Sequence, residues 1–179
     1  MLDKLIQFII DLGKDVLPFY IVEEWSGGVH FRFGHFLKPC TTGIHWKIPF
    51  FDSIYQTLTI TQSLDMNPQS VTTSDDKSIV VKGVIRYHVG DVVPYMFRVH
   101  PADALVDTAQ SLIRHTIETK RWDELKNIGD ELTLGIAEEV REWGIVVEQV
   151  TLTDLALIKS IRIIQNGTNV QATANQIEF

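Results

Sequence analysis

The sequence predicts an α+β fold in which helices pack on one side of an antiparallel sheet, with an amphipathic helix preceding the sheet at the N-terminus. Two observations predict the sheet: apolar and polar residues alternate along residues 54–66 and again along residues 79–89. An alternation with a period of two is typical of half-buried strands. A third observation predicts the helices, because apolar residues after residue 100 recur every three or four positions.

Composition limits the classes of function. The chain has 179 residues, of which 45% are hydrophobic, and this is enough for a core in one or two small domains. Its net charge of −7, without a cluster of lysine or arginine, argues against a nucleic-acid partner, because phosphate binding needs a basic face. The single cysteine, Cys40, excludes an internal disulfide.

Residues 2–17 are predicted to form the N-terminal helix. Its apolar residues have helical spacing, and Pro18 should end it because the residue before a proline avoids the α region. A helix of this length reaches about 24 Å, short of the roughly 30 Å hydrocarbon core of a bilayer. Asp11 and Lys14 would each add roughly 2.5–3.5 kcal/mol near the membrane centre, so the segment is not expected to span a membrane.

The apolar face of this helix leaves two interpretations open. It lies in the plane of a membrane interface, or it packs on its own domain or on a neighbouring one. The acidic balance of the helix weakens the membrane interpretation, since anionic lipid would not attract it. The predicted membrane-binding residues on this face are Leu2, Leu5, Ile6, Ile9, Ile10, Val16 and Leu17.

The stretch before residue 54 predicts short strands and turns. Residues 27–34 form a turn and a strand with apolar residues on one face, Gly43 should supply a positive φ, and Pro49 should end a strand. Potential metal ligands recur here at every fifth position, whereas structural zinc sites favour pairs two to four residues apart. No metal is therefore expected at His30, His35, Cys40 and His45.

The two alternating segments, residues 54–66 and 79–89, are predicted to pair antiparallel and to form the spine of one sheet. Between them Asp75 and Asp76 are expected to form a turn, since aspartate in turns accepts hydrogen bonds from nearby backbone donors. The predicted apolar face of the sheet consists of Ile54, Leu58, Ile60, Leu64 and Met66 in the first strand and Ile79, Val81, Ile85, Tyr87 and Val89 in the second.

Two amphipathic helices follow. The first carries apolar residues from Ala102 to Ile117, and the second carries them from Leu132 to Trp143, with Gly144 as its C-cap. A strand over residues 144–155 closes the domain. A short last helix is then expected to carry Leu157, Ile158, Ile161 and Ile164.

Five ordered segments of this chain carry a family resemblance. They include the turn that ends at Asp75, the strand that ends in Arg86-Tyr87-His88-Val89, and an earlier stretch with Arg32, Gly34, Gly43, His45, Pro49, Phe50 and Asp52. Together they resemble the SPFH (band-7) family of stomatins, prohibitins, flotillins and the HflK/HflC proteins. The resemblance spans roughly residues 27–160. The chain departs from the family at Thr42, where a proline is expected before Gly43.

The resemblance implies a non-catalytic, membrane-associated scaffold that self-assembles into a ring or cage-like homo-oligomer. Such a scaffold organises the membrane or partner proteins, for example a membrane protease or another membrane protein, and needs no cofactor. The resemblance also favours the membrane interpretation of the N-terminal helix, so the expected location is membrane-associated but not membrane-spanning. The expected organisation is the N-terminal helix over 1–18, an SPFH domain over 19–155, and a short C-terminal helix with a polar tail over 156–179.

Relatives continue into a long heptad-bearing helix, for which this chain is expected to have no room. Self-assembly is then expected to depend on the globular domain and the terminal segments, with an interface at Ile158, Ile161 and Ile164. Two alternatives stay open: a soluble structural ring or adaptor of a larger assembly such as a viral or phage particle, and a hydrolase with a dispersed site. An enzyme is not expected, because the sequence lacks a nucleophile with a partner base, a phosphate-binding glycine loop and metal-ligand spacing.

Overall fold

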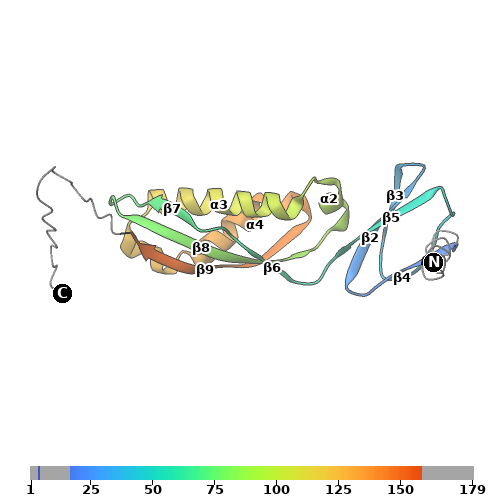
Figure 1. The fold of residues 1–179 in the computed structure, drawn as a ribbon, viewed down its shortest axis with the longest axis horizontal. Coiled ribbons are helices and arrows are strands. Elements are labelled where there is room, and N and C mark those ends of the chain that lie inside the picture. The colour runs from blue at the N-terminus through green and yellow to red at the C-terminus, as the bar shows by residue number, and fades with distance from the viewer. Residues whose placement is uncertain (1–3, 5–16, 159–179) are drawn as a thin grey trace, which may run out of the picture.

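A computed structural model describes residue 4 and residues 17–158 of the chain. The described chain is elongated, with a small all-β part at one end and a larger part of sheet and helices at the other (Figure 1). We name residues 17–58 the β subdomain and residues 61–158 the α+β body. The structure confirms the α+β class and the antiparallel pairing. It does not describe the predicted N-terminal helix.

The β subdomain contains two small antiparallel sheets. One is the two-stranded ribbon of β1 (Phe19–Val22) and β4 (Gly43–Trp46). The other has three strands in the order β3 (His35–Cys40), β2 (Ser26–Arg32) and β5 (Asp52–Leu58). Its buried apolar side chains in the described structure are few: Val22, Val29 and Cys40.

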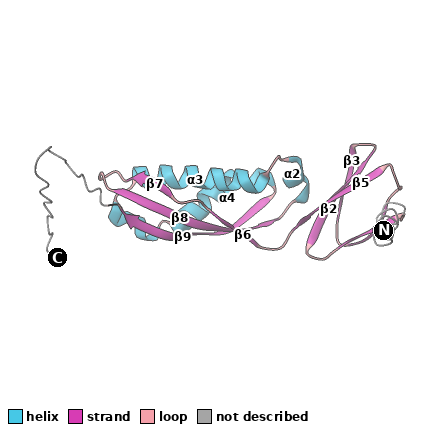
Figure 2. Ribbon diagram, viewed as in Figure 1, coloured by secondary structure: helices cyan, strands magenta, loops and turns pink. Residues whose placement is uncertain are grey.

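The α+β body is built around one long strand, β8 (Ser78–Val89). Two short strands, β6 (Gln62–Asp65) and β7 (Gln69–Thr72), pair with one edge of β8, and β9 (Ile145–Leu157) pairs with the other. Helices α3 (Pro101–Thr119) and α4 (Gly129–Glu139) cover one face of this sheet (Figure 2). The shorter elements are α2 (Val92–Phe97) and the 3-10 turns η1 (Trp122–Asn127) and η2 (Arg141–Trp143).

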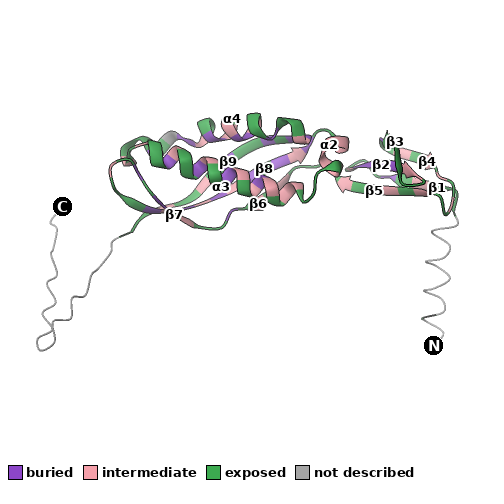
Figure 3. Cartoon of the chain, turned by 90° about the horizontal axis from the view of Figure 1, so that it is seen from above, coloured by how far each residue is buried: buried purple, intermediate pink, exposed green. Residues whose placement is uncertain are grey.

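Between the sheet and the helices lies one continuous hydrophobic core (Figure 3). The predicted face of β8 is confirmed in full, because all of its members are buried: Ile79, Val81, Ile85, Tyr87 and Val89. The four-residue spacing in α3 is confirmed as well, and it places Leu105, Ala109, Ile113 and Ile117 in the same core. Burial is also the first cause that raises the pKa of Tyr87, to about 12.

The predicted strand over residues 54–66 is wrong as a single element. The structure divides it into β5, which pairs with β2 in the β subdomain, and β6, which pairs with β8 in the body. Leu58 and Ile60, which were expected on the helix-covered face, are 43% and 51% exposed. The reason is that an alternating pattern identifies residues on a common face but does not identify the partner strand or what covers the face.

The end of the domain also differs from the expectation. Strand β9 continues through Leu157, where a helix was predicted to begin, and the Ile158 N–H donates to the Ser78 carbonyl over 2.8 Å. The second helix ends at Glu139, before the predicted Trp143, because a 3-10 turn follows it. Gly144 then closes that turn with a φ of 74°, as the predicted glycine cap requires.

Some predicted residues lie outside the described part of the chain. Of the seven predicted membrane-binding residues, Leu17 is described and is 45% exposed, whereas Leu2, Leu5, Ile6, Ile9, Ile10 and Val16 are not described. Of the predicted interface, Ile158 is described and is 43% exposed, and Ile161 and Ile164 are not described. Among the helices that are described, none has the length and apolar character needed to cross a membrane.

Candidate functional site

Exposed apolar side chains are concentrated in the β subdomain. Within the described residues, fourteen large apolar side chains are exposed between residues 17 and 58, against seven from Ile60 onward. All members of the continuous hydrophobic core lie in the body, between Met66 and Val150. An exposed apolar surface of this density is not needed for folding, and such surfaces mark sites that bind membranes or other proteins.

The β1–β4 ribbon presents one wholly apolar face. The cross-strand pairs are Phe19 with Trp46 and Ile21 with Ile44, and alternation along the strands places all four side chains on the same side. Ile44 is 72% exposed and Trp46 is 75% exposed, which reverses the burial expected of such residues. The opposite face is covered at Val22, which is buried, and the rings of Tyr20 and His45 stack on it with centroids 5.2 Å apart.

The turn between β2 and β3 places a phenylalanine where the backbone is unfavourable for it. Phe33 and Gly34 connect the paired residues Arg32 and His35, with φ values of 51° and 78°. A two-residue turn with both φ values positive favours Asn-Gly, and a bulky side chain at its first position is strained. Phe33 is nevertheless 67% exposed, so packing does not explain its presence. Strain that folding does not require indicates a functional position.

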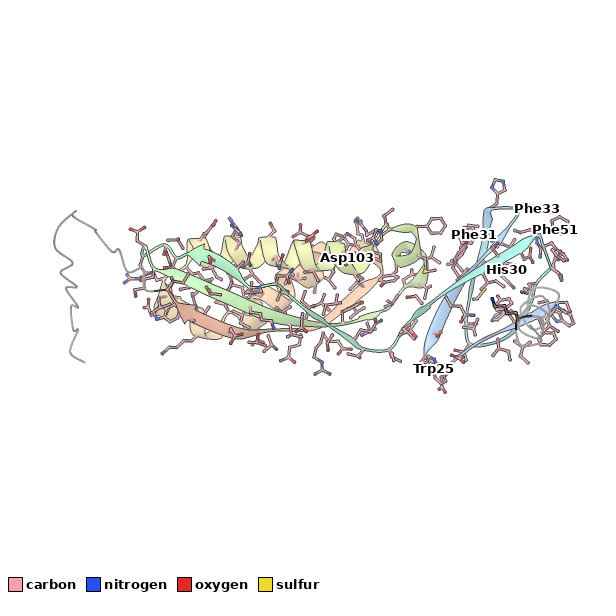
Figure 4. All side chains as sticks on the ribbon, viewed as in Figure 1. Trp25, His30, Phe31, Phe33, Phe51 and Asp103 are labelled. Atoms are coloured by element: carbon pink, nitrogen blue, oxygen red, sulfur yellow. The ribbon has the colours of Figure 1, made fainter. Side chains whose placement is uncertain are left out.

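The loop over residues 47–51 shows the same combination. Phe50 has a φ of 69° and is 82% exposed, and Phe51 beside it is 52% exposed. The Phe33 N–H donates to the Phe51 carbonyl over 2.9 Å, and the two rings lie 4.9 Å apart (Figure 4). We name the exposed apolar set of this loop, the β2–β3 turn and the ribbon the apolar tip; its members are Phe19, Ile21, Phe33, Ile44, Trp46, Ile48, Phe50 and Phe51.

An ion pair between the buried Asp52 carboxylate and the partly exposed Arg32 guanidinium lies behind the apolar tip. The Asp52 side chain has no exposed surface, and Arg32 donates to it through two nitrogens, Nε to Oδ1 over 2.8 Å and Nη2 to Oδ2 over 3.0 Å. The Ile48 N–H also donates to Asp52 Oδ2 over 2.8 Å. The Arg32 guanidinium is the main reason why the pKa of Asp52 lies well below its usual range, despite the burial that opposes this.

The four residues considered as metal ligands do not converge. The buried His30 lies against Asp52, with 2.9 Å between Nε2 and Oδ2, and Cys40 lies 2.6 Å from the Tyr20 hydroxyl. His45 contacts the Thr41 carbonyl, and His35 is exposed at the start of β3. Within the described residues, no three histidine, cysteine, aspartate or glutamate side chains gather to hold a metal ion. Metal content itself stays a prediction.

Tyr20 joins this polar interior from the ribbon side. Burial is the first cause that raises the pKa of its hydroxyl above the usual range, and the contact with Cys40 adds to the effect. The interior of the β subdomain is therefore more polar than that of the body. It contains the buried side chains of His30 and Asp52, whereas the core of the body consists of apolar residues.

The predicted turn at Asp75 and Asp76 is confirmed. Asp75 Oδ1 accepts from the Thr73 hydroxyl over 2.6 Å and from the Trp122 N–H over 3.2 Å, and Asp75 Oδ2 lies 2.9 Å from Lys77 Nζ. These contacts, with that from Thr73 first, lower the pKa of Asp75. Asp75 therefore stabilises a turn of the body, as Asp52 stabilises a loop of the β subdomain.

The apolar tip is not evident from the sequence patterns. Alternation places Phe33 on the apolar face of a strand, where burial is expected, and Phe50 is only one residue of a family motif. A usable signal was present in the aromatic run from Trp46 to Phe51, together with the Phe33-Gly34 turn, in a stretch too short to bury so many large side chains.

Comparison with known proteins gives a consistent result. The family model described as SPFH domain / Band 7 family matches residues 20–178. A protein of Methanocaldococcus jannaschii is 30% identical over 84% of this chain and 78% of its own length. Mouse stomatin is 28% identical over 76% of this chain and 51% of its own length, and protein HflK of Haemophilus influenzae is 27% identical over 70% and 32%. The chain thus spans about half the length of the first of these two named relatives and about a third of the second.

Proposed function

Because the chain belongs to the SPFH domain / Band 7 family, we propose that it is a non-catalytic, membrane-associated scaffold that inserts its apolar tip into lipid and self-associates through its body. The observation that carries this proposal is the concentration of exposed apolar side chains at one end of the molecule. The scaffold organises the surrounding membrane or partner proteins.

The tip has the chemistry that a lipid surface requires. Moving a large apolar side chain from water into an apolar phase is worth roughly 1.5–3 kcal/mol at most. Eight such side chains support anchoring of a chain even if each is only partly immersed. Phe33, Trp46 and Phe50 are rigid and large, and their backbone positions project them from turns and a strand end. Aromatic residues of this kind favour the boundary between headgroups and acyl chains.

The chain enters the β subdomain beside the tip. The Lys47 N–H, in the loop that carries the tip, donates to the Pro18 carbonyl over 2.9 Å. A membrane-binding segment before Leu17, as the sequence predicts, would therefore reach the same lipid surface as the tip. Two anchors on one surface strengthen each other, because the second binds at a high effective concentration.

Self-association is the second half of the proposal. The α+β body lies away from the tip, so it stays free to contact neighbouring copies on the membrane surface (Figure 1). Leu157 and Ile158 at the end of β9 are exposed apolar residues at the far end of the body. Contacts repeated between neighbouring copies close into a ring when the rotation allows it.

Flotation with lipid vesicles tests membrane binding. The variant Trp46→Ser with Phe50→Ser removes two exposed side chains of the tip, and we expect it to lower vesicle affinity by at least about tenfold for each side chain. The matched control is Val99→Ser with Leu134→Ser, which removes two side chains of the body that are 81% and 73% exposed. The control should float like the unmodified chain.

Two outcomes would contradict the proposal. If the unmodified chain does not float with vesicles of either neutral or anionic phospholipid, the tip does not bind membranes, and a soluble adaptor that uses the tip to bind a protein becomes the better explanation. If the tip and body variants lose affinity equally, the tip is not the membrane-binding surface.

A further inference from the structure

The exposed loop of the apolar tip needs a support that its own residues do not provide. Residues 47–51 connect β4 and β5 and carry Ile48, Phe50 and Phe51, all of them exposed in the described structure. Phe50 has a positive φ, and such a conformation persists only when its surroundings determine it. An apolar loop without support would fold back on the subdomain to escape water.

Asp52 holds both ends of this loop together. Its carboxylate accepts the Ile48 N–H over 2.8 Å, and its own N–H donates to the Ile48 carbonyl over 3.0 Å. The Phe51 N–H donates to the same carbonyl over 3.3 Å. The loop is therefore closed at its base by a carboxylate and a backbone pair, while its side chains remain outside.

Two residues of β2 hold Asp52 in turn. Arg32, the cross-strand partner of Asp52, donates hydrogen bonds to both carboxylate oxygens, and His30 Nε2 lies 2.9 Å from Oδ2. The His30 side chain is buried, and its approach to Asp52 is an ionic contact, because neither of its ring nitrogens has a hydrogen bond of good geometry among the described residues. Arg32 also directly precedes Phe33, whose N–H donates to the Phe51 carbonyl. One cluster around the buried Asp52 carboxylate is thus connected to both the loop and the turn.

We propose that His30, Arg32 and Asp52 are positioning residues for membrane binding, which hold the loop over residues 47–51 and the turn at Phe33 so that their aromatic side chains face lipid. The proposal rests on the proposed function, because it assigns the support of the surface that is proposed to bind the membrane. The lipid contacts themselves belong to the tip. The cluster acts through the backbone of the loop.

A purely structural role for the ion pair predicts a different result. If Arg32 and Asp52 only stabilise the β subdomain, removing the charge would lower its stability while the folded molecules keep an ordered loop. A positioning role predicts that the loop loosens in molecules whose strands remain paired. The Ile48 and Phe51 amides distinguish these cases, because their hydrogen bonds belong to the loop and not to a strand ladder.

The test compares Asp52→Asn with Asp75→Asn. Asp75 is a matched control, because its carboxylate also accepts from a hydroxyl or cationic side chain and from a backbone N–H, but it supports a turn of the body. Amide hydrogen exchange is measured in water without vesicles, and flotation is measured separately. We expect Asp52→Asn to speed exchange at Ile48 and Phe51 by roughly tenfold or more, the effect of losing a hydrogen bond to a charged acceptor.

The same variant should lose vesicle affinity by a similar factor, whereas Asp75→Asn should change neither measurement at the tip. Unchanged exchange at Ile48 and Phe51 in Asp52→Asn would overturn the positioning role. Faster exchange with unchanged flotation would overturn its connection to membrane binding. If the unmodified chain does not float at all, the proposed function fails, and exchange alone then decides whether the cluster supports the loop.

A second variant keeps the test decisive if Asp52→Asn does not fold. Arg32→Lys keeps the positive charge but removes the planar two-nitrogen grip on the carboxylate. We expect faster exchange at Ile48 and Phe51 with the exchange of β8 amides unchanged. If this variant folds with the exchange at the loop unaltered, the positioning role is wrong.

Discussion

The β subdomain and the α+β body use apolar residues in opposite ways. In the body, the alternating residues of β8 face α3 and α4 and are buried to within a few per cent, with Ile79 and Ile85 at 0% exposed. In the β subdomain, Ile44 and Trp46 alternate with polar residues in the same way, yet they are 72% and 75% exposed. No helix in the described structure covers the ribbon (Figure 2).

The difference separates two uses of apolar side chains, burial in the core of the body and exposure on the surface of the β subdomain. The body holds the continuous core, and it can therefore fold with its helices as the second layer. The subdomain holds a polar interior around Asp52 and presents its apolar side chains outward. In the proposed function, lipid supplies the layer that the described structure lacks over the ribbon.

The largest expected effect is the difference in stability loss between two isoleucine truncations, one in the body and one in the β subdomain. Ile113→Ala removes a core side chain of α3 that is 1% exposed, and it should lower the free energy of unfolding by about 2–5 kcal/mol. Ile44→Ala, at a ribbon position that is 72% exposed, should change it by less than about 0.5 kcal/mol. Urea denaturation followed by circular dichroism measures both. A large loss of stability in Ile44→Ala would mean that the ribbon face is covered in the protein, and it would contradict the contrast between the two parts.

A smaller effect, with opposite signs in two assays, is expected at Phe33. Phe33→Asn creates the Asn-Gly pair that the turn favours, and it should raise the free energy of unfolding by about 1 kcal/mol. The same change removes an aromatic residue of the tip, so vesicle affinity should fall by roughly tenfold. Thermal melting and flotation report the two quantities.

The control for this prediction is Phe36→Asn. Phe36 lies in strand β3 and packs on Phe31 and Phe97, with ring centroids 6.1 and 5.5 Å apart. Asparagine is unfavourable in a strand, so this variant should lose stability instead of gaining it. If Phe33→Asn also destabilises the chain, the residue serves folding and the strain argument is wrong.

The smallest effect on stability is expected at the far end of the body. Ile158→Glu changes an exposed residue and should alter the free energy of unfolding by less than about 0.5 kcal/mol. It should nevertheless reduce self-association, because a neighbouring copy would then have to bury an unpaired charge. Mass photometry at micromolar concentration measures the change, with Leu134→Glu on α4 as a control that should assemble normally. An unmodified chain that stays monomeric would contradict the self-association proposal itself.

The sequence by itself determined the main elements of the body, namely the long strand β8, the two helices and the closing strand. Alternation in β8, the helical spacing of Leu105 to Ile117, the glycine cap at Gly144 and the turn at Asp75 all describe local geometry that the residues impose on themselves. In a two-layer unit, residues that share a face are also the residues that are buried, because the neighbouring elements of the chain cover that face. The ordered motifs also indicated the family to which the chain belongs, and the comparisons confirm it.

Tertiary structure decided which apolar faces stay uncovered. Residues 54–66 keep one alternating register in the sequence, apart from Gln56 and Gln62 on the apolar face. Pairing with β2 at one end and with β8 at the other nevertheless divides them between two sheets. Arg32 and Asp52 were recognised as motif residues. Their contact with each other, however, depends on the register between β2 and β5, which sequence spacing does not specify. Exposure of Trp46 and Phe50 depends on the absence of a covering layer in the described structure, and a local pattern carries no information about elements that are not beside it.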